Sequence, residues 1–323
     1  MILAGDIGGT STRIGVFETA GSRLTPVVEE VYSSREHAGL DQIVRKFVST
    51  HSLSITCASF GVAGPVRNGR SETPNLPWVV DARALAAELG IEGVGLINDL
   101  EANAYGIAAL EARDFIVLNQ GAADAVGNAA IISAGTGLGE AGMYWDGKQH
   151  RPFASEGGHA DFSPRNELET ELLSYMLTKI ARVSYERVLS GPGLYNIYRF
   201  LRDTGRGSEP AWLTIELAKG DRSAAISQAA LAGKSELCSQ ALDMFVGFYG
   251  AEAGNMALRY LAIGGVYIGG GIAPKIIEKL RGPVFMEAFV AKGRLRPLLE
   301  GIPVRVILND KTALLGAARF ATL

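Results

Sequence analysis

Two polar side chains, Asn98 and Asp99, stand where an apolar stretch of the chain ends. The stretch predicts a strand over 95–97, and α/β proteins place ligands beyond the carboxyl ends of their strands. A carboxylate there can orient an attacking hydroxyl group and accept its proton, as phosphoryl transfer requires. The alternative is structural, because an Asn-Asp turn can also cap a helix, here expected over 99–111. Asp99 is therefore a candidate general base, with a helix cap as the competing interpretation.

Glycine turns containing a threonine occur twice, in LAGDIGGTSTRIGVF (3–17) and in ISAGTGLGEAGMYW (132–145). Both segments have the pattern of a strand, a glycine turn and a second strand. Glycines let backbone N–H groups converge on one point, and the threonine hydroxyl adds a donor, which suits phosphate oxygens. Either turn alone could be an ordinary hairpin. The repetition predicts two related halves, each with a phosphate-binding turn.

Asp6 lies directly before the first of these turns. A carboxylate beside a phosphate site indicates a cation, and Mg²⁺ is held by one or two carboxylates together with substrate phosphates. Asp6 would then contact Mg²⁺ directly or through water. The alternative is an aspartate that stabilises the turn before Gly8 and Gly9.

A third glycine cluster, VYIGGGIAPKIIEKL (266–280), follows a predicted strand and enters a helix with Pro274 in its first turn. The backbone can approach a flat ligand such as adenosine here, although glycine at such a turn can also serve packing alone. Two familiar nucleotide motifs are excluded. Gln228 replaces the first glycine of a P-loop pattern ending at Ser235, and the N-terminal glycines lack the G-x-G-x-x-G spacing.

A second polar cluster contains Glu156, His159 and Asp161, with Glu186 further along the chain. Carboxylate and imidazole groups can pair with the adjacent hydroxyls of a hexose and reject analogues that lack one. With four histidines in the chain and no cysteine near His159, a hydrogen-bonding histidine is favoured over a metal ligand. Glu186 alone could also be a solvated helix residue.

Short apolar strands alternate with helical patterns, which predicts an α/β fold with a largely buried mixed sheet. The expected strands are 2–4, 13–17, 55–61, 95–97, 115–118, 129–133, 142–145, 265–268 and 304–307. The expected helices are 36–50, 81–89, 99–111, 166–180, 190–204, 235–260, 274–280 and 311–321. Asp81, Asp99 and Asp310 each stand at or near a predicted helix start.

Composition points to a small-molecule enzyme. The 323 residues exceed what one core usually fills, so two domains are expected. A net charge of −3 without a basic block disfavours nucleic acid and anionic membranes as partners. Two cysteines far apart, with no apparent signal peptide or membrane-length apolar run, favour a cytoplasmic protein.

Six segments together resemble the bacterial glucokinase family in order and spacing over nearly the whole chain. They are GDIGGT (5–10), INDLEANA (97–104), AGTGLG (134–139), EGGHADFSP (156–164), ERVLSGPGL (186–194) and GGGIAP (269–274). The family has a two-domain actin-like (ribonuclease H-like) sugar kinase fold, with mixed sheets flanked by helices, which closes over sugar and ATP. The resemblance implies a small domain of 1–110 plus 301–323, a large domain of 111–300, and a homodimer.

The resemblance also implies a role for each matching residue. Asp99 would be the base for the glucose 6-hydroxyl, with ATP and Mg²⁺ as cofactors. The implied sugar contacts are Asn75, Asn98, Asp99, Glu156, His159 and Glu186. The implied nucleotide contacts are Asp6, Gly8, Gly9, Thr10, Gly135, Thr136 and Gly137 at the phosphates, and Gly270 and Gly271 near the nucleoside.

Departures from the family pattern are small. Ser11 stands where relatives often have Asn, and Ser155 where they often have Gly. No cysteine-rich loop follows His159, so the related zinc-containing group is a poorer match. A kinase of mannose or N-acetylglucosamine remains an alternative, because loop geometry decides which hydroxyl is recognised. A non-catalytic sugar-sensing regulator is disfavoured, since the pattern begins at Ile2 and leaves no room for a DNA-reading module.

Overall fold

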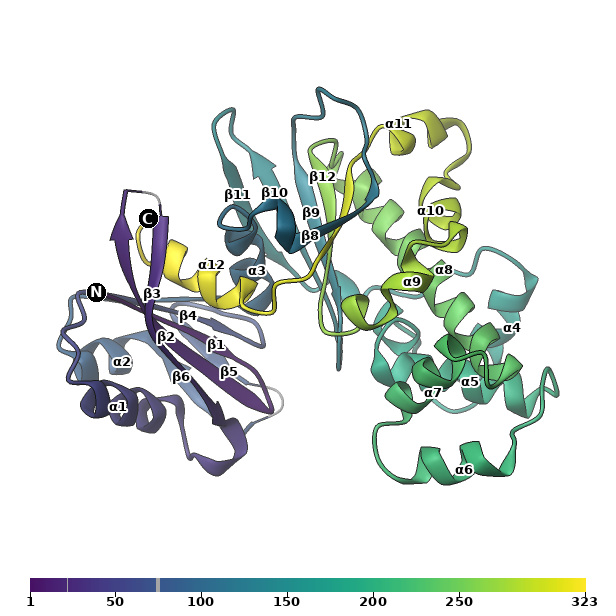
Figure 1. Ribbon diagram of the computed structural model, residues 1–323, viewed down its shortest axis with the longest axis horizontal. Helices are drawn as coiled ribbons and strands as arrows, with labels where there is room; N and C mark the ends of the chain where they lie inside the picture. Colours follow the sequence, from purple (N-terminus) through teal and green to yellow (C-terminus); the bar gives the residue numbers. More distant parts are fainter. Residues whose placement is uncertain (22, 74–75) are drawn as a thin grey trace. The chain divides into compact units, whose positions relative to one another are not determined.

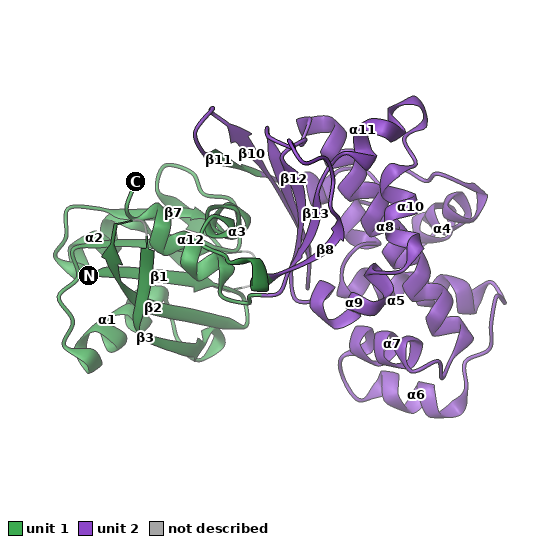
Figure 2. Cartoon of the chain, turned by 45° about the horizontal axis from the view of Figure 1, so that its top comes forward, with its two compact units in different colours: residues 1–114, 150–154, 309–323 green, residues 115–149, 155–308 purple. Residues whose placement is uncertain are grey.

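The computed structural model describes residues 1–21, 23–73 and 76–323. These divide into two compact units, drawn in different colours in Figure 2. Unit 1 consists of Met1–Asp114, His150–Ala154 and Asn309–Leu323, and unit 2 of Phe115–Gln149 and Ser155–Leu308. The domain assignment of 1–110 plus 301–323 and 111–300 stays a prediction.

Unit 1 is built on a mixed sheet with the strand order β3-β2-β1-β4-β7 (Figure 1). Its strands are β1 (Ile2–Ile7), β2 (Ser11–Ala20), β3 (Arg23–Ser33), β4 (Cys57–Val62) and β7 (Val94–Asn98). β1, β4 and β7 run parallel, whereas β1 and β2 form an antiparallel hairpin. A separate small sheet pairs β5 (Arg70–Glu72) with β6 (Val79–Asp81). The parallel strands therefore end at one common edge.

Helices of unit 1 pack on this sheet through regularly spaced apolar side chains. They are α1 (Leu40–His51), α2 (Ala82–Leu89), α3 (Asp99–Ile107) and α12 (Thr312–Phe320), with short 3-10 turns η1 (Ser34–Glu36) and η2 (Ala112–Asp114). α1 buries Leu40, Ile43, Val44 and Phe47, the spacing of one helix face. α3 and α12 cross closely, because a Cβ added to Gly316 would overlap the carbonyl oxygen of Ala102.

Unit 2 repeats the strand arrangement of unit 1. It contains β8 (Phe115–Asn119), β9 (Ala129–Ala134), β10 (Leu138–Trp145), β12 (Gly265–Gly269) and β13 (Val304–Ile307). Their order is β10-β9-β12-β13-β8, with β9, β12 and β13 parallel and β9–β10 an antiparallel hairpin. β2-β1-β4-β7 in unit 1 has the same pattern. The two predicted strand–turn–strand segments are thus confirmed as equivalent hairpins. The division assigns residues 150–154 of β11 (His150–Ser155) to unit 1.

Unit 2 contains more helices than unit 1 (Figure 1). They are α4 (Glu167–Leu177), α5 (Gly191–Asp203), α6 (Ala211–Ala218), α7 (Arg222–Leu231), α8 (Glu236–Tyr260), α9 (Ile277–Leu280), α10 (Pro283–Val290) and α11 (Arg296–Glu300). Short 3-10 turns are η3 (Gly157–His159), η4 (Tyr185–Arg187), η5 (Ala273–Ile276) and η6 (Gly293–Leu295). α8 is buried on nearly all sides from Phe245 to Ala257. None of the helices in the described ranges is long and apolar enough to cross a membrane.

Several elements differ from the sequence-based expectation. The strand over 23–33 was not predicted, because its side chains are mostly exposed or half-buried and Pro26 interrupts the pattern. α6, α7, α10 and α11 were also missed. The helix expected from residue 36 begins at Leu40, since Gly39 has an extended backbone and precedes the first helical turn. The helix expected over 99–111 ends at Ile107.

Candidate active site

The carboxyl edge of the unit 1 sheet carries both Asp6, on β1, and Asp99, just beyond β7, with β4 between these two strands. In the parallel register, Asp6 on β1 is opposite Gly61 on β4, and Gly61 is opposite Ile97 on β7. Asp99 follows two residues after Ile97, directly beyond the strand end. Two strand spacings separate β1 from β7, or roughly 10 Å. The first glycine turn and the Asn98-Asp99 pair therefore share one edge of one sheet.

Asn98, rather than Asp99, caps α3. The Asn98 Oδ1 atom accepts hydrogen bonds from the backbone N–H groups of Leu100 at 2.8 Å and Glu101 at 3.4 Å. Its amide nitrogen donates to the Gly64 carbonyl oxygen at 3.1 Å and carries a second donor hydrogen. Asp99 is the first helical residue, and its Oδ1 also accepts from Leu100 N–H at 2.9 Å. The Asn98 amide thus supplies the N-cap of α3, a role for which Asp99 is not required.

Of the two other residues expected near helix starts, Asp81 caps a helix and Asp310 does not. Asp81 is the N-cap of α2, and its Oδ1 accepts from the N–H groups of Arg83 and Ala84. Asp310 does not cap α12, which has Lys311 at its N-cap position. Its carboxylate instead accepts a hydrogen bond from Arg13 at 2.9 Å.

Asp6 lies in an environment that opposes a negative charge. Burial raises the pKa of its carboxyl group to about 6, with Asp310 raising it further and Arg13 opposing the shift. Arg13 is opposite Asp6 in the β1–β2 register and is also paired with Asp310 and Glu29. A divalent cation would stabilise the ionised form of a carboxylate held this way. The donor set therefore fits Mg²⁺ carried in with a phosphate ligand. Among the described residues, no group of three or more His, Cys, Asp or Glu side chains forms a metal cluster.

Hydrogen bonds from the buried Ser34 hold the first glycine turn in place. Gly8 N–H donates to the Ser11 carbonyl oxygen at 3.0 Å and closes the turn. Ser34 Oγ donates to the Gly8 carbonyl oxygen at 2.7 Å, and the Ser34 N–H donates to the Thr10 carbonyl oxygen at 3.0 Å. The Thr10 side chain is exposed. These hydrogen bonds hold the backbone of the turn, while the exposed Thr10 side chain is accessible to a ligand.

The second glycine turn has the same plan in unit 2. Gly135 N–H donates to the Gly137 carbonyl oxygen at 2.9 Å, and the Thr136 side chain is exposed. The Gly135 carbonyl oxygen accepts from Gly191 N–H at 2.8 Å, so the first residue of α5 adjoins the turn. The positive end of the α5 dipole lies beside this turn, which favours an anion there.

Glu186 is attached to this turn and is not a solvated helix residue. Its Oε2 accepts a hydrogen bond from Leu138 N–H at 3.0 Å, and a Cβ on Gly137 would lie 2.5 Å from the same atom. Glu186 is half-buried in η4. Its carboxylate therefore lies at the start of β10, immediately after the phosphate-type turn.

Glu156 and His159 lie at the same end of β10. They flank Gly157 and Gly158 in the η3 turn, and a Cβ on Gly158 would overlap the Leu138 carbonyl oxygen. Both side chains are exposed. Asp161 is different, because its Oδ1 pairs with Arg182 at 2.7 Å. Unit 2 thus brings Glu156, His159 and Glu186 together beside the second glycine turn.

The third glycine cluster contains two different glycines. Gly270 has a φ of +82°, and a Cβ there would meet the Ala134 carbonyl oxygen, so packing against β9 requires glycine. Gly271 is exposed, and a Cβ there would meet nothing within 4 Å. β12 is parallel to β9, so this cluster and the Gly135 turn lie at one sheet edge. Pro274 lies in the first turn of the segment after the glycines, as expected, but this segment is the 3-10 turn η5 followed by α9 rather than one α-helix over 274–280.

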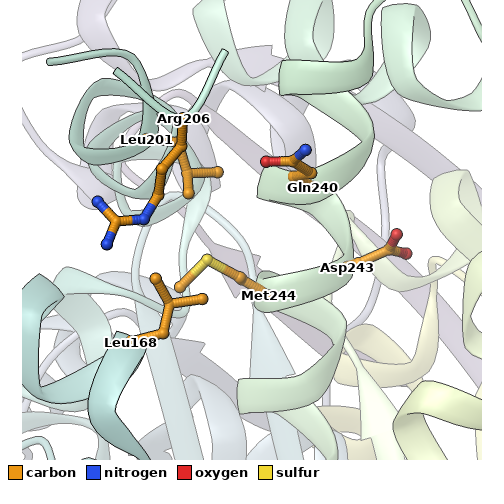
Figure 3. Close-up of a pocket in the computed structure, with 6 residues that line it drawn as sticks. All are labelled: Leu168, Leu201, Arg206, Gln240, Asp243 and Met244. Carbon is orange, nitrogen blue, oxygen red and sulfur yellow. The ribbon is translucent and has the colours of Figure 1, made fainter. Parts of the chain in front are cut away.

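Two remaining features lie outside these groups. Asn75, an implied sugar contact, falls outside the described residues. A cavity of about 490 Å³ in unit 2 is lined by Leu168, Leu201, Arg206, Gln240, Asp243 and Met244 (Figure 3). Its charged residues already have partners, since Arg206 bonds Glu171 and Asp243 bonds Lys279. The cavity contains none of the predicted site residues.

A family model described as Glucokinase matches residues 3–323. The chain belongs to the glucokinase family. The glucokinase of Nostoc sp. is 45% identical to it, over 98% of this chain and 98% of the relative. The resemblance found in the six sequence segments is thereby confirmed.

Solved glucokinase structures have the same fold. A glucokinase from an Antarctic psychrotroph superposes with a TM-score of 0.87 at 29% identity, covering 99% of this chain and 98% of that chain. A glucokinase from Balamuthia mandrillaris, solved in complex with glucose, gives a TM-score of 0.77 at 20% identity, covering 100% and 93%. The predicted actin-like sugar kinase fold is confirmed.

Sequence reasoning missed three residues that shape the sites of this glucokinase-family chain: Arg13, Ser34 and Glu140. Arg13 could have been found from the hairpin itself, because a tight β1–β2 turn places it opposite Asp6. Ser34 lies 26 residues from Gly8 and has no sequence signal that links it to the turn. Glu140 is a single charge in the otherwise apolar run LGEAGMY, and that is a signal of its own.

Proposed function

We propose that this protein is a glucokinase that transfers the γ-phosphoryl group of ATP to the 6-hydroxyl group of glucose. The observation that carries this conclusion is the glucokinase family match over residues 3–323. The two glycine turns and the carboxylate at a strand end, present in the described structure, are parts that such a reaction needs.

Asp99 is the proposed general base. In the reaction, the sugar oxygen forms a bond to the γ-phosphorus while the bond from that phosphorus to the leaving oxygen of ADP breaks. The hydroxyl proton passes to the Asp99 carboxylate. The capping of α3 by Asn98 supports this role, because Asp99 is not needed as the N-cap.

Sugar recognition is assigned to Asn75, Asn98, Asp99, Glu156, His159 and Glu186. Within unit 2, the grouping of Glu156, His159 and Glu186 at the start of β10 supports this assignment. Carboxylates accept hydrogen bonds from several sugar hydroxyls at once, so a sugar that lacks one leaves a polar group unpaired. Asn98 would use its remaining amide hydrogen.

ATP binding is assigned to the glycine turns and to Asp6. Gly8, Gly9, Thr10, Gly135, Thr136 and Gly137 would hold the phosphates through N–H and hydroxyl donors, and Gly270 and Gly271 would lie near the nucleoside. Asp6 would hold Mg²⁺ directly or through water. Bound Mg²⁺ neutralises phosphate charge as it develops in the transfer. We further propose a cytoplasmic homodimer.

A hexose panel tests this function. Purified protein receives ATP and Mg²⁺ with glucose, mannose, fructose or N-acetylglucosamine while ADP release is followed. We expect glucose to give the highest kcat/KM and glucose 6-phosphate as the product. If another sugar is turned over more efficiently, that sugar and not glucose is the substrate. ADP release that does not depend on any sugar would reject the kinase assignment.

A further inference from the structure

Glu140 is a buried carboxyl group that the proposed reaction does not use. It lies on β10 with a relative exposure of 1%. Both of its side-chain oxygens lack a hydrogen-bond partner among the described residues. An acidic side chain is rarely fully buried without a partner, so its position calls for an explanation.

The carboxyl group of Glu140 lies directly against Gly157. A Cβ added to Gly157 would overlap Glu140 Oε2 and would lie 3.0 Å from its Cδ atom. The Gly157 N–H donates to Ser155 Oγ at 2.9 Å. Gly158 is held against the Leu138 carbonyl oxygen in the same way. The η3 turn therefore rests on β10, with the Glu140 side chain as part of its support.

This support lies under two proposed sugar contacts. Glu156 immediately precedes η3 and His159 ends it, and the His159 N–H donates to the Glu156 carbonyl oxygen at 3.0 Å. A shift of Gly157 would move both residues, because only Gly157 and Gly158 lie between them. Side chains that bind a ligand need such support to hold their geometry.

We propose that Glu140 is a positioning residue for sugar binding, whose buried carboxyl group fixes the Glu156–His159 turn through its contact with Gly157. This inference rests on the proposed sugar kinase function. It assigns to Glu140 no contact with the sugar or with ATP.

The surroundings of Glu140 favour its neutral form. Burial raises the pKa of the Glu140 carboxyl group to about 8, the negative charge of Glu252 adds to the shift, and Arg259 opposes it. Glu252 is fully buried on α8 and is paired with Arg259 at 2.7 Å. Arg259 is thus already neutralised by Glu252. At neutral pH the contact under Gly157 is made by an uncharged acid.

Glu252 also interacts with η4, the turn that carries the proposed sugar contact Glu186. Tyr185, next to Glu186 in η4, accepts a hydrogen bond from Asn255 at 3.1 Å, and its hydroxyl also interacts with Glu252. Lys292 donates to Asn255 at 2.6 Å, and burial lowers the pKa of Lys292 to about 8. Ionised Glu140 would place a second negative charge beside Glu252, near the turns η3 and η4. Sugar affinity should therefore fall when Glu140 loses its proton.

Steady-state kinetics with glucose between pH 6.5 and 9.5 test the proposal. In the wild-type protein, KM for glucose should rise above pH 8, and E140Q should abolish this rise because glutamine cannot ionise. Lys292 titrates in the same range, so a rise that persists unchanged in E140Q would overturn the assignment to Glu140. Direct calorimetric titration of glucose without ATP provides the same comparison for binding alone.

A double-mutant cycle tests the contact with Gly157. G157A should raise KM for glucose by about three- to tenfold with a smaller effect on KM for ATP, because its methyl group collides with Glu140. E140A removes the support and should also raise KM for glucose. The double variant should bind glucose better than G157A alone, since the collision is gone. Strictly additive effects of G157A and E140A would reject the contact as a determinant of sugar binding.

Two controls separate a specific effect of Glu140 from a general effect of substitution or of unfolding. E216Q changes an exposed glutamate on α6 and should match the wild-type protein at every pH. Circular dichroism and thermal melts of each variant identify loss of folding, which would lower kcat and active concentration rather than raise KM selectively. A wild-type protein that neither binds nor phosphorylates glucose would refute the proposed function itself. Normal wild-type turnover with a pH-independent KM would refute only the role of Glu140.

Discussion

Asn98 and Asp99 are adjacent residues with different duties at the start of α3. Because the Asn98 side chain accepts from Leu100 and Glu101 N–H groups, the helix start does not depend on the charge of Asp99. An asparagine at position 99 can keep the hydrogen bond from Leu100 N–H through its own oxygen. The side-chain cap of α3 is therefore kept when Asp99 is neutralised.

Asp99→Asn should lower kcat by roughly 10²- to 10⁴-fold while the dissociation constant for glucose changes little. Calorimetric titration of glucose and initial-rate kinetics measure the two quantities separately. Asp81→Asn is the matched control, since Asp81 caps α2 in the same unit and asparagine is an equally good cap. Wild-type turnover in the Asp99 variant would remove this residue from the role of base.

Glu140 also predicts how stability depends on pH. Burial raises the pKa of its carboxyl group to about 8 in the folded protein, whereas an unfolded glutamate has a pKa near 4.5, so only the folded state holds the proton between these values. The wild-type protein should therefore lose stability as pH rises from 4.5 to 8, by roughly 5 kcal/mol from this group. Glu140→Gln should remove that loss.

Urea unfolding of the wild-type protein and Glu140→Gln at pH 5 and pH 8 measures this difference. We expect the stability of the variant, relative to that of the wild-type protein, to be higher at pH 8 than at pH 5. Glu287→Gln, an exposed position on α10, is the control and should give the same difference from wild type at both pH values. An equal urea midpoint shift at both pH values for Glu140→Gln would contradict a proton held by the folded state.

At the scale of helices and strands, the crossing of α3 and α12 positions the start of α3. Gly106 and Gly316 allow the approach, since a Cβ on Gly106 would overlap the Thr312 carbonyl oxygen and one on Gly316 that of Ala102. Side chains at these positions would push the helices apart. α3 carries Asp99, so the crossing matters for the proposed base as well as for the core.

Gly316→Ala should destabilise the protein by about 1–3 kcal/mol, because the helices must separate to admit the methyl group. Thermal or urea denaturation measures the change, and kcat should fall with it if α3 shifts. Gly93→Ala is the control, since a Cβ at Gly93 would meet nothing within 4 Å. Equal stability of the two variants would show that the crossing tolerates a side chain.

Local patterns predicted the elements that carry the candidate site better than those that surround it. The glycine hairpins, β7 and the start of α3 follow from strand, turn and cap signals within a few residues. β3 was missed because nearly all of its residues are exposed or half-buried, and α6 and α7 because their burial depends on distant partners in unit 2. The Ser34 bond to Gly8 and the Glu140 contact with Gly157 are tertiary, so a short window cannot contain them.

At the scale of the whole chain, the hydrophobic residues form separate cores. One large cluster includes β9, β12 and α8 in unit 2, and smaller clusters lie on the sheet of unit 1 around Phe60 and Leu314. Two cores of different size have different melting behaviour unless their interface is extensive. Proteins with this organisation commonly depart from a single two-state transition.

We expect the calorimetric enthalpy of unfolding to exceed the van't Hoff enthalpy in the absence of ligands. Gly316→Ala should shift only the transition that belongs to unit 1, and the buried Trp78 reports on that unit by fluorescence once Trp145 and Trp212 of unit 2 are replaced by phenylalanine. Differential scanning calorimetry with and without Gly316→Ala provides the comparison. Equal enthalpies, with both probes melting together, would indicate one cooperative block.

The matching strand orders of the two units contrast with the segments that connect the strands. In unit 1, the connection from β3 to β4 holds only η1 and α1, whereas in unit 2 residues 156–264, between β11 and β12, hold the five helices α4 to α8. Glu156, His159 and Glu186 all belong to this long connection, whereas both glycine turns belong to hairpins that the two units share. The proposed sugar contacts of unit 2 therefore lie in a segment with no counterpart of similar length in unit 1.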